Sequence, residues 1–402
     1  MRRLTMLVGA GGSVELGIPG TPATTDSLVK DPSDEGTRKL WHEELETLRA
    51  VKASLKGWYS APNFEHMLHA LECIVSLERS WQPKTAEKFR VIYARLCAGP
   101  NDDFRGLFNR GVAASATGYL YTGLHDTFAE SSAAAVGHEH WTSYQRLWSL
   151  LAQQFGLDVV TTNYDSLIES AVPHLDQGFD TISGEVVHRF DPRRFRAAEH
   201  RLAHLHGSIH FGYRQGGDPN RFVYEDDWED LYWHLDPMDA RRSWGSRSHH
   251  TSQAGEESIV GPLITGMQKP NKVLASEPYL TYYRSLGAFI QDNDRLLVIG
   301  YGFGDVHINQ SISRMTRWHG ANRKIAVITY CPEKEWIYRR YGHDHLEEEH
   351  TIMRWSEEHM PWTDTLRHAQ VWTSSNGLVR IYTGGFLDTV SNHVDDLLRF
   401  LS

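Results

Sequence analysis

The sequence has few cysteines and no long hydrophobic run. Its three cysteines, Cys73, Cys97 and Cys331, lie far apart among 402 residues and form no Cys-x-x-Cys pair. They can build neither a four-cysteine zinc module nor a disulfide framework, and free thiols suit a reducing compartment. The apolar run near the amino terminus ends at Gly9, too short for a signal-peptide core, and no run approaches the ~18 apolar residues of a membrane helix. We therefore expect a cytoplasmic protein with no zinc and no membrane segment.

An excess of basic residues is also lacking. Lys+Arg number 41 and Asp+Glu 51, which gives a formal net charge of −10. This balance argues against a generally basic surface for nucleic acid, so direct nucleic-acid binding is not indicated. Hydrophobic residues make up 40% and charged residues 23%, the mixture of a globular protein of one large or two ordinary domains.

Short apolar runs alternate with amphipathic segments along much of the chain. The runs predict strands at 4–8, 157–162, 202–205, 296–299 and 325–329. Apolar residues at three- and four-residue spacing predict helices at 279–292, 307–318 and 387–401. This alternation predicts an α/β fold, Rossmann-like and doubly wound, with a mostly parallel sheet covered by helices on both faces.

Nearly all of the chain from residue 35 to residue 155 has the periodicity of helices. We read this block as a helical insertion after the first strand. The predicted domains are therefore a Rossmann domain formed by 1–33 and 156–402, and an insertion formed by 34–155.

Polar or glycine-rich clusters follow four of the predicted strands. Ligands of doubly wound sheets bind at the carboxyl ends of the strands, where strand order reverses. The backbone N–H groups of a glycine loop at residues 9–13 can approach a pyrophosphate closely. Val14 stands where the third glycine of the dinucleotide fingerprint belongs, and no P-loop motif occurs. A glycine turn that serves only packing remains the alternative for this loop.

Four motifs taken together resemble those of sirtuins, the NAD-consuming family of the silent information regulator type. Gly9-Ala10-Gly11-Gly12-Ser13 with Gly17-Ile18-Pro19 resembles their opening motif. Thr161-Thr162-Asn163-Tyr164-Asp165 resembles Thr-Gln-Asn-Ile-Asp, and Leu205-His206-Gly207 resembles Leu-His-Gly. Gly300-Tyr301-Gly302-Phe303-Gly304-Asp305 with His307-Ile308-Asn309 is similar to a segment of the bacterial defence branch. The motifs keep the family's order.

The resemblance implies an NAD site and specific roles within it. Asn163, His206 and Asp165 are the implied catalytic residues. The implied cofactor-binding residues are Gly9, Ala10, Gly11, Ser13, Gly17, Ile18, Pro19, Thr162, Gly300, Tyr301, Phe303, Asp305 and His307.

Two departures from the family point away from protein deacylation. The four-cysteine zinc module is missing, and Gly20-Thr21 replaces the Phe-Arg of deacylases. The branch without zinc is known mainly for hydrolysing NAD, often in anti-phage defence. The resemblance therefore implies an NAD+ glycohydrolase, self-assembly into a homo-oligomer, and a partner such as a HerA-type hexameric ATPase.

The residue types suit this chemistry. Cleavage of the nicotinamide–ribose bond gives an oxocarbenium-like sugar that water must reach on its open face. The amide of Asn163 can hydrogen-bond the ribose and a water together. His206 can accept a proton near neutral pH, and an ionised Asp165 can hold a ribose hydroxyl or favour the developing positive charge.

Each of these residues also has a plain structural interpretation. Asn163 or Asp165 could cap a helix that starts near Ser166. His206 could be a core histidine, and a metal site formed with His204 and His210 is conceivable.

Two other functions remain open at this stage. One is a different NAD-dependent reaction, deacylation or ADP-ribosyl transfer. The other is a regulatory subunit of a defence complex that binds NAD or ADP-ribose without turning it over.

Overall fold

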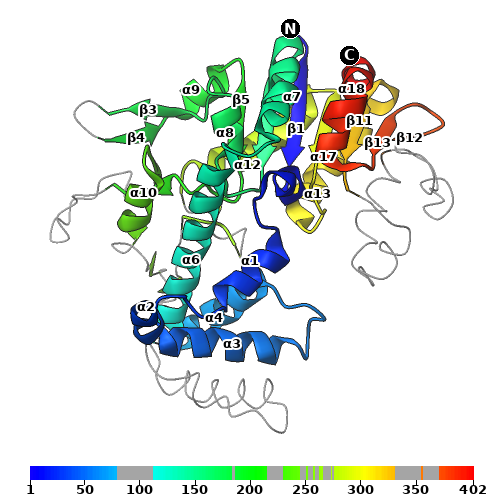
Figure 1. Ribbon diagram of the computed structural model, residues 1–402. Coiled ribbons are helices and arrows are strands. Elements are labelled where there is room, and N and C mark those ends of the chain that lie inside the picture. The colour runs from blue at the N-terminus through cyan, green and yellow to red at the C-terminus, as the bar shows by residue number, and fades with distance from the viewer. Residues whose placement is uncertain are drawn as a thin grey trace. The chain divides into compact units, whose positions relative to one another are not determined.

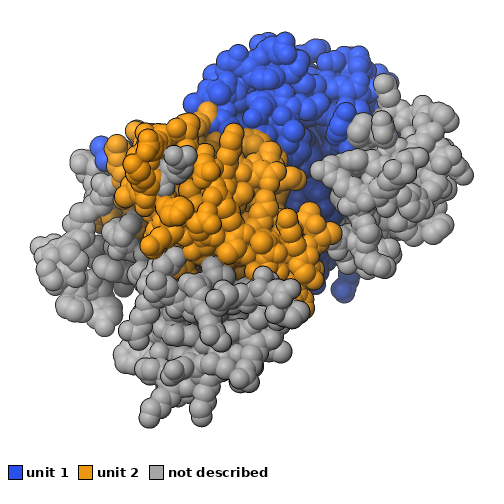
Figure 2. All heavy atoms as spheres, turned by 60° about the horizontal axis from the view of Figure 1, so that its bottom comes forward, with its two compact units in different colours: residues 1–18, 131–208, 277–402 blue, residues 19–130, 209–276 orange. Residues whose placement is uncertain are grey.

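The structure is a computed structural model, and it describes residues 1–78, 112–182, 186–214, 230–244, 250–251, 257–258, 262–265, 273, 276–330, 355 and 371–402. The chain divides into two compact units, which Figure 2 colours separately. Unit 1 consists of residues 1–18, 131–208 and 277–402. Unit 2 consists of residues 19–130 and 209–276.

Unit 1 is built on a seven-stranded sheet of order β12-β13-β11-β10-β1-β2-β5. All pairs are parallel except the antiparallel pair of β12 and β13 at one edge. The strands are β1 (Arg3–Val8), β2 (Gly156–Thr161), β5 (Arg201–His204), β10 (Arg295–Ile299), β11 (Lys324–Ile328), β12 (Val371–Thr373) and β13 (Val379–Tyr382). A short antiparallel hairpin of β3 (Phe179–Thr181) and β4 (Val187–Phe190) also lies in this unit.

Strand β1 lies in the middle of the sheet (Figure 1), with β2 paired on one side and β10 on the other. Five of its six residues are buried, as expected for a central parallel strand covered on both faces. The chain proceeds from β1 to β2 and β5 in one direction, and from β10 to β11 and β13 in the other. The strand order therefore reverses between β1 and β10, which is where a doubly wound sheet opens a ligand crevice.

Two groups of helices pack on this sheet. The helix α7 contacts β2, and α18 contacts β11, while the residues between Thr389 and His393 contact both helices. The helices α12, α13 and α14 contact one another and form the second group. Figure 1 shows α7 and α18 in front of the strands. The helices of unit 1 are α7 (Trp141–Gln154), α8 (Leu167–Ala171), α9 (Pro192–Ala197), α12 (Tyr279–Asp292), α13 (Val306–Ser313), α14 (Met315–His319), α17 (Gly385–Asp388) and α18 (Val394–Leu401).

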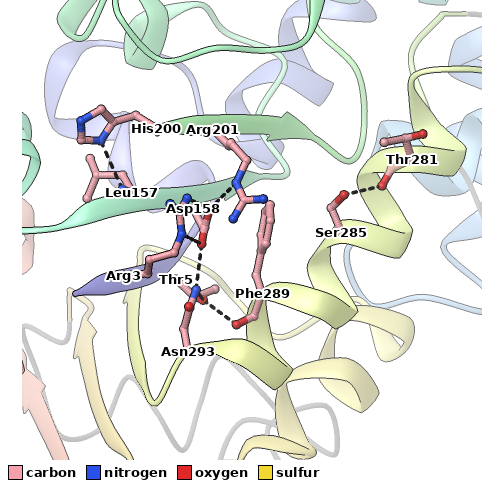
Figure 3. A network of polar contacts seen from close by, with 10 residues as sticks. All are labelled: Arg3, Thr5, Leu157, Asp158, His200, Arg201, Thr281, Ser285, Phe289 and Asn293. Atoms are coloured by element: carbon pink, nitrogen blue, oxygen red, sulfur yellow. Dashed lines mark hydrogen bonds and ion pairs between the residues drawn. The ribbon is translucent and has the colours of Figure 1, made fainter. Parts of the chain in front are cut away.

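A polar network ties the strands of unit 1 together on the side of their amino ends (Figure 3). The buried carboxylate of Asp158 accepts hydrogen bonds from Nε of Arg3 at 2.7 Å and from Nε of Arg201 at 2.6 Å. The amide of Asn293 donates to the same carboxylate at 2.8 Å and to the hydroxyl of Thr5 at 2.9 Å. One buried acid thus links β1, β2 and β5 with the end of α12.

Unit 2 is mainly helical. Its helices α3 and α4 contact each other, and α1 contacts α4. A short antiparallel pair, β6 and β7, contacts α10. The elements are α1 (Thr21–Leu28), α2 (Glu35–Leu40), α3 (His42–Leu55), α4 (Phe64–Glu78), β6 (Phe211–Gly212), β7 (Tyr232–His234), α10 (Pro237–Ser243), β8 (His250–Thr251), β9 (Glu257–Ser258) and α6 (Val112–Ala135), which begins here and ends in unit 1.

The predicted α/β fold with a mostly parallel sheet is confirmed, as are the five predicted strands. The predicted helix at 307–318 is two helices, α13 and α14. The edge strands β12 and β13 were not predicted. Part of the predicted helical block, residues 79–111, lies outside the described residues.

The boundaries of the two units differ from those of the predicted domains, which stay a prediction. The helix α7 falls in the unit of the sheet because it packs against β2 and α8. Residues 209–276 group with the helical unit. Within the described residues, we find no helix that is both long and apolar enough to span a bilayer.

Candidate functional site

The carboxyl ends of four neighbouring strands meet at one edge of the sheet of unit 1. Val8 of β1 is the register partner of Ile299 in β10 and of Thr161 in β2, and Thr161 is the partner of His204 in β5. The loops that follow these residues carry the four motifs found in the sequence. Asn163 and His206 each stand two residues beyond a register pair, so they follow adjacent strands at the same level.

The glycine loop after β1 packs backbone to backbone against the loop after β10. The N–H of Gly9 donates to the carbonyl of Ile299, and that of Gly11 to the carbonyl of Gly300, each at 2.9 Å. A Cβ atom on Gly11 would lie 2.8 Å from Cα of Gly300, and one on Gly300 would lie 2.1 Å from the nitrogen of Gly12. Gly300 also has a φ of +57°, which L side chains rarely adopt.

This packing changes the interpretation of the glycine loop. The N–H groups of Gly9, Gly11, Gly12 and Ser13 all donate to backbone carbonyls. The glycines therefore have the packing role given above as the alternative. That the loop also binds a phosphate stays a prediction, and its donors would have to exchange these carbonyls for the ligand.

Asn163 is the side chain best placed for a ligand. It is only 6% exposed, and its Nδ2 donates to Oγ of Ser13 at 3.0 Å. This hydrogen bond fixes the orientation of the Asn163 amide, because Nδ2 is bound to Ser13 and Oδ1 is on the other side of the amide. Among the described residues, Oδ1 of Asn163 accepts no hydrogen bond although it is shielded from solvent. A buried acceptor without a donor requires an explanation, and a bound hydroxyl or water supplies one.

Asp165 is a buried carboxylate two residues further along. Its Oδ1 accepts the N–H of Leu167 at 3.2 Å, so it does help to cap α8. Burial raises the pKa of Asp165 from 3.8 to about 6, and the nearby Glu169 acts in the same direction. Hydrogen bonds from Leu167 and Ser13 and the charge of His204 oppose the rise in this pKa.

The hydroxyl of Ser13 connects the side chains of Asn163 and Asp165. Its hydroxyl oxygen accepts from Asn163, and its hydrogen bond to Asp165 lowers the pKa of that carboxylate. The residue predicted to bind the cofactor is thus, in this structure, the link between two predicted catalytic residues.

His206 contacts a carboxylate from a strand that is not its neighbour. Its Nε2 lies 3.0 Å from Oδ2 of Asp305, and both side chains are 7% exposed. The other oxygen of Asp305 accepts the N–H of His307 at 3.3 Å and caps α13. A histidine that donates from Nε2 to a carboxylate has Nδ1 as its basic nitrogen. Asp305 thus contacts the predicted catalytic histidine, and its predicted contact with a cofactor stays a prediction.

The loop that carries Asp305 is held by its own aromatic residues. The hydroxyl of Tyr301 donates to Oδ1 of Asn309 at 3.1 Å, and Nδ2 of Asn309 donates to the carbonyl of Phe303 at 2.6 Å. Phe303 is buried and has a φ of 54°, a strained conformation for a residue with a side chain. Tyr301 and Phe303 thus shape the loop, and their predicted contact with a cofactor stays a prediction.

The remaining predicted residues are spread more widely. Thr162 donates its N–H to the carbonyl of Val8, and Ile18 is buried and donates its N–H to the carbonyl of Ser13. Ala10, Gly17 and His307 are exposed, and Pro19 falls in unit 2.

The three histidines considered for a metal site have different partners. Nε2 of His204 lies 3.0 Å from Oε1 of Glu169, while His206 contacts Asp305. His210 belongs to unit 2, where its Nδ1 contacts the carbonyl of His234. The described residues contain no group of three potential metal ligands.

Sequence reasoning missed the pairing of His206 with Asp305 and the pairing of His204 with Glu169. Asp305 lies 99 residues from His206, and no local sequence pattern predicts their contact.

Comparison with known proteins found similar solved structures and a matching family model. Three of the similar solved structures have low identity to this chain, with TM-scores of 0.39, 0.35 and 0.30. The first is a mutant Sir2 homologue in complex with 2'-O-acetyl ADP-ribose, at 12% identity over 99% of this chain and 91% of that chain. The second is a mutant Sir2 homologue in complex with ADP-ribose, at 11% identity over 99% and 93% of the two chains.

The third is a sirtuin analysed for its substrate affinity, at 13% identity over 81% of this chain and 82% of that chain. A search of the curated proteins found no match. Residues 158–349, just under half of the chain, match the family model described as a SIR2-like domain. Asn163, His206 and Asp305 all lie within that match, so this part of the protein is similar to the SIR2-like domain family.

Proposed function

We propose that this protein is an NAD+ glycohydrolase that cleaves the nicotinamide–ribose bond to give nicotinamide and ADP-ribose. The observation that carries the proposal is the buried Oδ1 of Asn163, which accepts no hydrogen bond among the described residues and follows the strand next to that of His206, the residue paired with Asp305. The match of residues 158–349 to the SIR2-like domain family supports it.

The reaction would use these groups as follows. The bond between the anomeric carbon and the nicotinamide nitrogen breaks, and its electron pair leaves with the neutral nicotinamide. Oδ1 of Asn163 accepts a hydrogen bond from the attacking water or from a ribose hydroxyl. The oxygen of water bonds to the anomeric carbon, and the water proton passes to the imidazole of His206. An ionised Asp165 favours the positive charge that develops on the sugar.

The test is an NAD-consumption assay on the purified protein, with nicotinamide and ADP-ribose measured as products. Removing one positioning group of this kind typically costs about 10²–10³ in rate, so we expect Asn163→Ala to lose about that factor in kcat. Asn322→Ala changes an exposed asparagine of the same unit and should behave as wild type. NAD loss at the normal rate by the Asn163→Ala protein contradicts the site assignment.

Two other outcomes, one from this assay and one from calorimetry, favour the other functions. NAD loss that strictly requires an acyl-lysine peptide or an acceptor protein indicates deacylation or ADP-ribosyl transfer. Calorimetric binding of NAD without release of nicotinamide, even with a partner present, indicates a regulatory subunit.

We further propose that the enzyme depletes cellular NAD in anti-phage defence, as a homo-oligomer acting with a HerA-type hexameric ATPase. This proposal rests on the resemblance of the segment at 300–309 to the defence branch. Light scattering on the protein alone and after mixing with such an ATPase tests the assembly. A monomer that does not change in mass on mixing contradicts it.

A further inference from the structure

The helical segment at residues 385–401, which runs from α17 through α18, begins without a cap of its own. Gly384 stands at the N-cap position and has no side chain that could accept the N–H groups of the first turn. The N–H of Gly385 donates to the carbonyl of the residue that follows β11. The N–H groups of Phe386 and Leu387 therefore need another acceptor.

Glu15 supplies that acceptor from a position 371 residues away from Phe386. Its Oε2 accepts the N–H of Phe386 at 2.7 Å and the N–H of Leu387 at 3.0 Å. A carboxylate at the positive end of a helix makes charge-assisted hydrogen bonds, which are stronger than neutral ones. A Cβ atom on Gly385 would lie 3.1 Å from Oε1 of Glu15, so the bare backbone at this position leaves the carboxylate room to approach.

The first turn of this helical segment is held on the rest of unit 1. Phe386 is 2% exposed, and the centroid of its ring lies 5.2 Å from that of Tyr144 on α7. The helix α17 also contacts the short 3-10 helix at Ala10–Gly12, in the glycine loop. The first turn is therefore a fixed support beside that loop.

Glu15 is closely connected to Ser13, two residues before it. It lies in a short 3-10 helix, Val14–Leu16, where the N–H of Leu16 donates to the carbonyl of Ser13 at 3.0 Å. The N–H of Ile18 donates to the same carbonyl, and Leu16 and Ile18 are both buried. A displacement of Glu15 would therefore move the backbone of Ser13.

The side chain of Ser13 holds the predicted catalytic residues. Its Oγ accepts a hydrogen bond from Nδ2 of Asn163 at 3.0 Å, and its hydroxyl also hydrogen-bonds Asp165. The direction of Oδ1 of Asn163 depends on this contact, because the amide turns as one rigid group. A misplacement of about 1 Å caused by a residue far from the reacting atoms can cost about 10² in rate.

We propose that Glu15 is a positioning residue, which ties the loop after β1 to the first turn of the helical segment 385–401 and so keeps the hydroxyl of Ser13 against Asn163. Where a cap serves only its own helix, it can come from the N-cap residue itself, as Asp236 does for α10. The effect on catalysis rests on the proposed function, whereas the tie between the two segments can be measured without turnover.

Hydrogen exchange followed by mass spectrometry tests the tie without NAD. In Glu15→Ala we expect the amides of residues 384–390 and those of residues 9–18 to exchange about tenfold faster or more, because a charge-assisted acceptor is lost. Glu15→Gln keeps an oxygen that can accept both N–H groups and should retain most of the protection. Residues 157–161 of β2 should keep their protection in every variant. Glu199→Ala removes an exposed glutamate of the same unit and should behave as wild type.

The second measurement is the steady-state kinetics of NAD hydrolysis. We expect Glu15→Ala to lower kcat by about tenfold and Glu15→Gln to restore most of it. Because Glu15 acts through Ser13, the variant with both Glu15→Ala and Ser13→Ala should lose no more kcat than Ser13→Ala alone. A merely structural role of Glu15 would lower stability without this dependence on Ser13.

The outcomes separate this inference from the proposed function. If the wild type consumes no NAD but exchange rises in both segments of Glu15→Ala, the proposed function fails and the tie stands. If exchange rises only at residues 384–390, Glu15 is a helix cap and nothing more, and the inference is wrong. An equal rise in β2 contradicts it as well, because Glu15 would then contribute only global stability. Additive losses of kcat in the double variant overturn the positioning role.

Discussion

Replacing Asp165 by asparagine should make the protein more stable, and increasingly so as the pH rises. Asparagine keeps an oxygen that can accept the N–H of Leu167, so the cap on α8 is retained while the charge is removed. The pKa of Asp165 is about 6 in the folded protein and 3.8 as its ordinary value. Between pH 3.8 and pH 6, the carboxyl of Asp165 is therefore mostly protonated in the folded state and mostly ionised in the unfolded state.

The sign and size of the effect follow from proton linkage. Because the pKa is raised on folding, the stability of the wild type falls as the pH rises from about 3.8 through about 6. A difference of about 2.2 pKa units corresponds to about 3 kcal/mol at full ionisation. Between pH 5 and pH 8 the wild type should lose about 1.4 kcal/mol that the Asp165→Asn variant keeps.

The assay is urea unfolding of both proteins at pH 5, 6, 7 and 8, followed by tryptophan fluorescence. All other titrating groups are common to the two proteins, so their contributions cancel in the difference. A stability difference that stays constant over this pH range would show that Asp165 titrates normally, and the argument from its burial would then fail. The same variant should lose NAD hydrolysis, because the charge that favours the sugar cation is gone.

Three further substitutions test other parts of the structure. Gly300→Ala should cost about 2–4 kcal/mol in urea unfolding, because its Cβ would meet the backbone of the glycine loop at a positive φ. Gly304→Ala, where a Cβ has open space, should cost almost nothing, and equal costs for the two would refute the packing argument. Asp305→Asn keeps an oxygen that can cap α13 but removes the negative charge beside His206. We therefore expect kcat for NAD to fall by about 10², with a free energy of unfolding within about 1 kcal/mol of wild type. An unchanged kcat would show that Asp305 has no part in the site. Asp158→Ala leaves Arg3 and Arg201 without their shared acid and should cost about 2–3 kcal/mol, less than a fully buried pair because Arg3 is 31% exposed. Its kcat, measured well below the unfolding temperature, should match wild type, and a specific loss of kcat would contradict a purely structural role.

The sequence was sufficient to locate the sheet and the edge that carries the motifs. Runs such as Leu4–Val8 and Leu296–Ile299 are apolar on every residue or nearly so, which only a strand buried on both faces requires. Each run ends in glycine or polar residues, and parallel strands place their carboxyl ends at one edge. The positions of Asn163 and His206 at the same level therefore followed from strand pairing alone.

The edge strands β12 and β13 could not be predicted in this way. They are three and four residues long, and so short a segment gives no reliable hydrophobic periodicity. The assignment of α7 to the unit of the sheet was also beyond the sequence, because its helical periodicity is the same as that of its neighbours in the predicted insertion.

Only the tertiary structure decided which side chains and backbone groups contact each other. Asp305 contacts His206 although β10 and β5 are separated by two strands. The glycine N–H groups that looked available for a phosphate are used by neighbouring carbonyls. The contact between Glu169 on α8 and His204 on β5 likewise joins segments that are distant in the sequence. Residue types and strand periods are local properties that a sequence records, whereas these contacts depend on the path of loops between distant segments, which is fixed only when the whole unit packs.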